Sequence, residues 1–110
     1  MIKKKICVII NNRANYARIK SVLTAIKNHK KLQLQLILES SAVLPRYGSV
    51  DHIIKKKGFK INEVIYTVIE GENPTTMAKS SGLAIIELTT ILGKLRPDIV
   101  LTIADRYETL

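Results

Sequence analysis

The sequence is poor in cysteine, since Cys7 is the single thiol among 110 residues. One cysteine cannot form an internal disulfide, and it offers no cluster that could hold a metal ion. Cys7 stands inside the apolar run from Ile6 to Ile10. We therefore expect a small buried side chain in a strand, and not a reactive thiol.

Long apolar runs are also missing. The run from Ile6 to Ile10 is far too short to cross a membrane, and no small-residue cleavage site of a signal peptide follows it. These two absences predict a cytoplasmic protein with no membrane partner.

Acidic residues are scarce, with 9 Asp and Glu against 18 Lys and Arg and a net charge of +9. Much of the excess lies in the runs Lys3 to Lys5, Lys27/Lys30/Lys31 and Lys55 to Lys57. Such lysines are either solvated at strand starts and helix ends, or they attract anionic ligands or nucleic acid. No aromatic residues alternate with them and no nucleic-acid-binding motif occurs, so we expect no nucleic-acid partner.

Apolar runs typical of strands alternate with helical patterns along the whole chain. We expect strands at Lys4 to Ile10, Leu32 to Leu38, Ile61 to Ile69 and Ile99 to Ile103, and helices at Ala14 to Lys30, about Ser49 to Lys57, and Pro74 to about Lys94. The order predicts an α/β fold: a parallel sheet with right-handed crossovers and helices on both faces.

Finer features follow from single residues. The first and fourth strands should be covered on both faces, whereas Gln33 and Gln35 should lie on a less buried face of the second. Gly58 suits the position just past a helix end. Ser49 or Asp51, and likewise Asn73 before Pro74, suit helix starts.

Ligands of open parallel sheets bind beyond the carboxyl ends of the strands. The first such loop runs from Asn11 to Tyr16 and opens a helix, whose free backbone N–H groups can meet an anion. Arg13 adds a planar guanidinium that fits phosphate oxygens, although it could equally be a surface arginine. No Gly-x-Gly-x-x-Gly occurs here, which disfavours a dinucleotide such as NAD.

The fourth loop, from Ala104 to Glu108, follows the last strand. Asp105 could act there as an acid, a base or an orienting group. It could also simply cap a helix, and Glu108 three residues later completes a capping box. His29 and His52 lack metal-spaced partners, and the rings of Tyr16 and Tyr47 could line a pocket or only pack.

Several segments together resemble the hydrolysing UDP-N-acetylglucosamine 2-epimerases. They span nearly the whole chain: Lys5 to Ile10 with Asn12-Arg13-Ala14-Asn15-Tyr16, Pro45 to Gly48, Gly58 to Ile61, Met77 to Ser80 with Gly82 to Ala84, Leu95 to Ile99, and Asp105-Arg106-Tyr107-Glu108. The resemblance implies a glycosyltransferase-B-like architecture of two Rossmann-like domains. Residues 1–110 would form part of the N-terminal one, as a truncated fragment that is inactive alone.

The resemblance also implies a reaction and a site. UDP-N-acetylglucosamine would lose its C2 proton and UDP, and water would add to the resulting glycal to release N-acetylmannosamine. No cofactor is implied. Asp105 would be the acid/base candidate, whereas Arg13, Asn12, Arg106 and Glu108 would bind the UDP-sugar.

Three positions depart from the family pattern: Asn15 where an acid is common, Ala42 where many members have histidine, and Ala104 in place of glycine. These departures leave open an epimerase for a UDP-diacetamido sugar in legionaminic-acid synthesis. Two further alternatives are a different enzyme of the same architecture, such as a glycosyltransferase, and a non-catalytic basic α/β binding module. An exposed edge at strand four would argue against the module. Such an edge would favour a homo-oligomer or a segment-swapped dimer.

Overall fold

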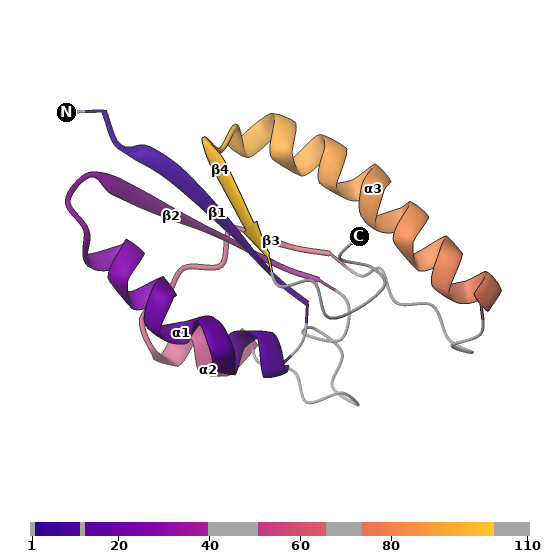
Figure 1. The fold of residues 1–110 in the computed structure, drawn as a ribbon, viewed down its shortest axis with the longest axis horizontal. Coiled ribbons are helices and arrows are strands. Elements are labelled where there is room, and N and C mark those ends of the chain that lie inside the picture. The colour runs from indigo at the N-terminus through magenta and orange to yellow at the C-terminus, as the bar shows by residue number, and fades with distance from the viewer. Residues whose placement is uncertain (1, 12, 40–50, 66–73, 103–110) are drawn as a thin grey trace.

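The computed structural model describes residues 2–11, 13–39, 51–65 and 74–102, and within its helices the side chains of residues 13, 14, 76, 77, 80, 81 and 84 fall outside this description. The described elements, in chain order, are β1 (Lys4–Ile10), α1 (Arg13–Asn28), β2 (Leu32–Leu38), α2 (Asp51–Lys56), β3 (Glu63–Val64), α3 (Pro74–Leu95) and β4 (Ile99–Thr102). The predicted alternation of strands and helices is therefore confirmed (Figure 1).

The strands form one four-stranded sheet in the order β3-β2-β1-β4, and every pair is parallel. β1 is central and pairs with β2 from Lys4↔Leu32 to Ile10↔Leu38. Its other neighbour is β4, with the register Ile6↔Ile99 to Ile9↔Thr102. The carboxyl ends of β1, β2 and β4 therefore lie at the same end of the sheet.

The two faces of the sheet carry separate cores, because alternate strand residues point to opposite sides. On one face, Ile6, Val8 and Ile10 pack with α1 and with Ile54 of α2. On the other face, Cys7, Ile9 and Ile37 pack with Ile91 of α3. Figure 1 shows α1 and α2 on one side of the sheet and α3 on the other, as an α/β fold of the Rossmann type requires.

Gln35 of β2 is more buried than the sequence predicted. Its side chain is only 4% exposed, although Gln33 beside it is exposed as predicted. The C-terminal end of α3 covers this part of the sheet, and the Gln35 Nε2 donates a hydrogen bond of 3.1 Å to the carbonyl oxygen of Leu95. The polar side chain is buried because a helix end offers it a free carbonyl.

β4 is less buried than the sequence predicted. Ile99 and Val100 are 56% and 43% exposed, so this strand is not covered on both faces. The reason is its place in the sheet: β4 is an outer strand, and within the described residues only β1 pairs with it. Among the described strands, none pairs with the outer side of β4.

Three element boundaries differ from the prediction. α1 ends at Asn28 instead of Lys30, and β3 is limited to Glu63–Val64 within a predicted strand whose second half lies outside the described residues. Asp51 is the first residue of α2 and not its cap, whereas the other candidate caps, Ser49 and Asn73, are also outside them. Gly58 follows α2 with a φ of +88°, as its predicted role requires.

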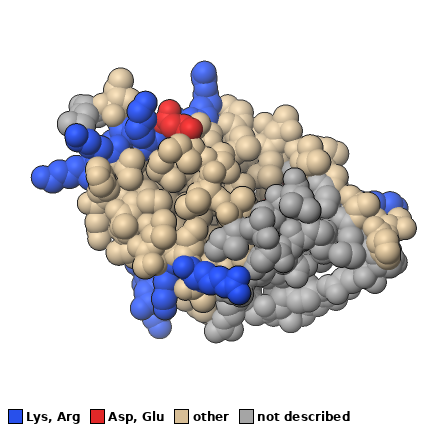
Figure 2. Space-filling view, viewed as in Figure 1, with Lys and Arg blue, Asp and Glu red and all other residues tan. Residues whose placement is uncertain are grey.

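Most of the described lysines are exposed. Figure 2 shows Lys and Arg side chains at several separate places in this view, with one group at the upper left. Lys94 of α3 forms an ion pair with Glu63 of β3. No described helix is long and apolar enough to span a membrane.

Candidate functional site

A buried polar cluster marks the carboxyl end of the sheet. Asn11 directly follows β1 and Glu39 directly follows β2, so the two residues continue the register of this parallel pair. Asn15 stands in the first turn of α1. The side chains of Asn11, Asn15 and Glu39 are 0%, 1% and 1% exposed, respectively.

Hydrogen bonds tie this cluster together. The Asn11 Nδ2 donates to the Glu39 Oε1, and the Asn11 backbone N–H donates to the Asn15 Oδ1 at 3.2 Å. The Glu39 backbone N–H donates to the Ile10 carbonyl oxygen at 3.0 Å. The ends of β1 and β2 and the start of α1 are thus held in one network. Such a network offsets the desolvation cost of burying a carboxylate and two amides.

The predicted site residues fall at or beyond the limits of the described structure. Arg13 is the first residue of α1, but its side chain is not described. Asn12, Asp105, Arg106 and Glu108 lie outside the described residues altogether. Their roles therefore stay predictions. The described backbone supports one part of these predictions. β1, which precedes Arg13 in the chain, is a parallel neighbour of β4, which precedes Asp105.

The sequence pattern does not indicate that Asn11, Asn15 and Glu39 form a unit. On sequence alone, Asn11 begins the first loop and Asn15 is a departure from a family pattern. A signal was present, because Asn11 and Glu39 are each the first polar residue after a continuous apolar stretch. Their pairing needed the register of β1 and β2, which the sequence does not contain.

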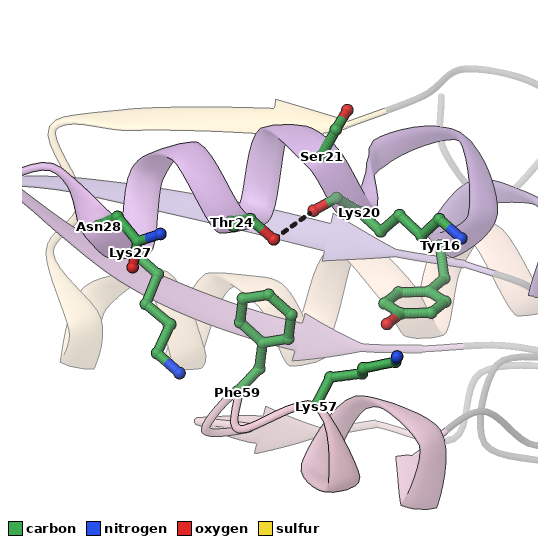
Figure 3. A pocket seen from close by; sticks show the side chains of 8 residues that line it. All are labelled: Tyr16, Lys20, Ser21, Thr24, Lys27, Asn28, Lys57 and Phe59. Carbon is green, nitrogen blue, oxygen red and sulfur yellow. Dashed lines mark hydrogen bonds between the residues drawn. The ribbon is translucent and has the colours of Figure 1, made fainter.

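A groove lies elsewhere, between α1 and the segment that follows α2 (Figure 3). Its volume is about 650 Å³, and its lining includes Tyr16, Lys20, Ser21, Thr24, Lys27, Asn28, Lys57 and Phe59. The Lys27 Nζ donates to the Gly58 carbonyl oxygen at 2.6 Å and lies 5.2 Å from the centre of the Phe59 ring. These contacts hold α1 to the end of α2, so Lys27 has a structural role here.

The other candidate side chains, Tyr16, His29, His52 and Cys7, lie either in the core or on the surface. Tyr16 is 7% exposed and belongs to the core under α1, although it also lines the groove. His29 and His52 are exposed, and the described residues contain no group of His, Cys, Asp and Glu that could hold a metal ion. Cys7 is fully buried, and its burial raises the pKa of the thiol to about 11, which suits the expected inert side chain.

Comparison with known proteins gives consistent matches. The family described as UDP-N-acetylglucosamine 2-epimerase matches residues 24–110. The GDP/UDP-N,N'-diacetylbacillosamine 2-epimerase (hydrolyzing) of Campylobacter jejuni is 32% identical over 110 residues, which are 100% of this chain and 28% of the relative. The UDP-N-acetylglucosamine 2-epimerase of Neisseria meningitidis serogroup B is 27% identical over 107 residues, which are 97% and 28% of the two chains.

A solved structure supports the same fold. The crystal structure of UDP-GlcNAc 2-epimerase from Neisseria meningitidis bound to UDP-GlcNAc superposes with a TM-score of 0.74 at 17% identity, over 96% of this chain and 27% of that one. The Rossmann-like α/β class is therefore confirmed. The chain spans about 28% of the length of the curated relatives it matches.

Proposed function

Because the chain belongs to the UDP-N-acetylglucosamine 2-epimerase family, we propose that it supplies part of the nucleotide-sugar site of a hydrolysing 2-epimerase. The whole protein would convert UDP-N-acetylglucosamine and water into N-acetylmannosamine and UDP. Residues 1–110 would contribute one part of an N-terminal Rossmann-like domain in a two-domain, glycosyltransferase-B-like enzyme of the cytoplasm.

The parallel pairing of β1 with β4 is the observation that carries this proposal. The carboxyl ends of parallel neighbouring strands lie at the same end of the sheet, so the chain reaches this end both at Ile10 and at Thr102. Arg13 follows the first of these residues in the chain and Asp105 follows the second. A diphosphate binder and an acid/base group would then flank one sugar nucleotide.

The proposed chemistry assigns each group a task. A base removes the C2 proton, the bond between C1 and the diphosphate oxygen breaks, and UDP departs with that electron pair to leave a glycal. Water then adds across the double bond and gives N-acetylmannosamine. Asp105 is the candidate acid/base residue. Arg13 and Asn12 would stabilise the charge on the departing diphosphate, with Arg106 and Glu108 as further substrate contacts.

One observation favours an alternative substrate. The Campylobacter relative, whose name specifies a diacetylbacillosamine nucleotide, is 32% identical, against 27% for the Neisseria UDP-N-acetylglucosamine enzyme. The alternative is therefore an epimerase for a UDP-diacetamido sugar. The non-catalytic module becomes the weaker reading, because the chain belongs to a family of enzymes and carries an exposed β4 edge.

The test compares the whole protein with residues 1–110. The whole protein should release UDP from UDP-N-acetylglucosamine or from the diacetamido nucleotide in a coupled assay, and the ratio of kcat/KM for the two compounds identifies the substrate. The 110-residue chain alone should release none. Substantial UDP release by this chain alone would show that its proposed inactivity is wrong, and release from neither compound by the whole protein would refute the epimerase assignment.

A further inference from the structure

The cluster of Asn11, Asn15 and Glu39 places a carboxylate and two amides where a protein core usually holds apolar side chains. A buried carboxylate loses its hydration, and apolar residues of similar volume usually stabilise a fold at least as well. Yet Glu39 is 1% exposed, and Asn11 is fully buried beside it. The cluster is better explained by what it holds in place.

The hydrogen bonds connect the strand ends to the start of α1. The bond from the Asn11 N–H to the Asn15 Oδ1 links the end of β1 to the first turn of α1. The Asn11 side chain is fixed in turn by the Glu39 carboxylate. Glu39 itself is anchored to β1, since its backbone N–H donates to the Ile10 carbonyl oxygen at 3.0 Å. The first turn of α1, which begins at Arg13, is therefore tied to the end of β1 through this cluster.

We propose that Glu39 is a positioning residue, which holds Asn11 and through it sets the position of the first turn of α1, which begins at Arg13, relative to the diphosphate of a nucleotide sugar. The part about the diphosphate rests on the proposed function, whereas the positioning is a property of this chain by itself. An indirect role suits the chemistry of Glu39. A carboxylate would repel a diphosphate at direct contact, but it is a strong acceptor for the Asn11 amide.

The experiment uses the 110-residue chain and three variants. Glu39→Ala removes the acceptor, and Glu39→Gln keeps an acceptor oxygen for the Asn11 amide. Gln35→Ala is the matched control, because Gln35 is also a buried polar residue of β2 with a side-chain hydrogen bond, made to Leu95 and not to the cluster. Amide hydrogen exchange is followed by NMR, and UDP is titrated into each protein by calorimetry.

The proposal predicts a local effect of Glu39→Ala. In this variant, the exchange rate of the amides of residues 13–17, divided by that of residues 23–27, should be about tenfold higher than in the wild type. This factor corresponds to the loss of one hydrogen bond to a charged group. UDP affinity should fall by about tenfold. Glu39→Gln should restore both quantities to within about twofold of the wild type. Gln35→Ala should lower stability without changing either the relative exchange rates or the affinity.

Two results would overturn the proposal. One is uniform acceleration of exchange along the whole of α1 in Glu39→Ala, as in Gln35→Ala, which would make Glu39 an ordinary stabilising residue. The other is no acceleration at all. If the wild-type chain binds no UDP, the nucleotide part of the proposed function fails for this chain, and the exchange rates alone still decide the positioning role.

Discussion

Arg13 stands at the start of α1, directly beyond the cluster of Asn11, Asn15 and Glu39. We expect Arg13→Ala to weaken UDP-N-acetylglucosamine binding by about tenfold or more, because a charge-assisted hydrogen bond contributes roughly 1.5–3 kcal/mol. Calorimetric titration at fixed salt measures this change.

Lys20→Ala is the control for Arg13→Ala, since it removes one positive charge from an exposed position of the same helix. This variant should bind within about twofold of the wild type at physiological salt, where exposed charges are screened. Equal losses in both variants would mean that Arg13 acts only through the overall charge of the surface.

Cys7 offers a test of burial through pH. Its thiol has a pKa of about 11 in the folded chain, against 9.0 as the ordinary value. The unfolded chain therefore forms the thiolate first. The contribution of Cys7 to the free energy of unfolding should be complete below about pH 9 and should be lost as the pH rises from about 9 to about 11.

Urea denaturation between pH 8 and pH 11 checks this expectation by comparison with Cys7→Val. The valine variant should lose less stability over that range, because it has no thiol to ionise. Parallel curves for the two proteins would show that the thiol titrates equally in the folded and unfolded chains.

At the scale of elements, two glycines should respond in opposite directions to alanine. Gly58 ends α2 with a φ of +88°, and a Cβ there would lie 3.0 Å from the Lys27 Nζ. Gly58→Ala should therefore lower the free energy of unfolding by about 1 kcal/mol or more.

Gly93 lies inside α3, and a Cβ at this position would meet nothing within 4 Å. Gly93→Ala should raise the free energy of unfolding by roughly 0.5–1 kcal/mol, because alanine loses less backbone entropy in a helix. Urea denaturation of both variants gives the two values. The same sign for both would contradict the assigned backbone roles.

At the scale of the whole molecule, the sheet has two outer strands, β3 and β4. β4 exposes Ile99 and Val100, and its outer edge can accept another strand. We expect the chain to associate through this edge. Val100→Lys should then remain monomeric at concentrations where the wild type forms dimers, because a charged lysine on an edge strand opposes its pairing with a strand of another copy.

Light scattering coupled to size-exclusion chromatography measures the association. Val64→Lys is the matched control, since Val64 is an exposed valine (39%) on the opposite outer strand. This variant should dimerise like the wild type. A wild-type chain that is monomeric at every concentration would refute association through β4.

The sequence by itself determined the order and type of the elements, the end of α2 at Gly58 and the burial of Cys7. These features depend on local causes: the spacing of apolar residues, the conformational freedom of glycine and the length of each run. The sequence also predicted that the strands are parallel, because strands joined by helical crossovers run in the same direction.

Only the tertiary structure decided which strands are neighbours and which are outermost. That choice exposed Ile99 and Val100, although their apolar run predicted cover on both faces. It also buried Gln35 beneath the end of α3 and joined Glu39 to Asn11 across 28 positions of sequence. The physical reason is common to all three cases: burial and hydrogen bonding depend on which residues the register and the packed helices bring together, and the order of residues along the chain does not specify those partners.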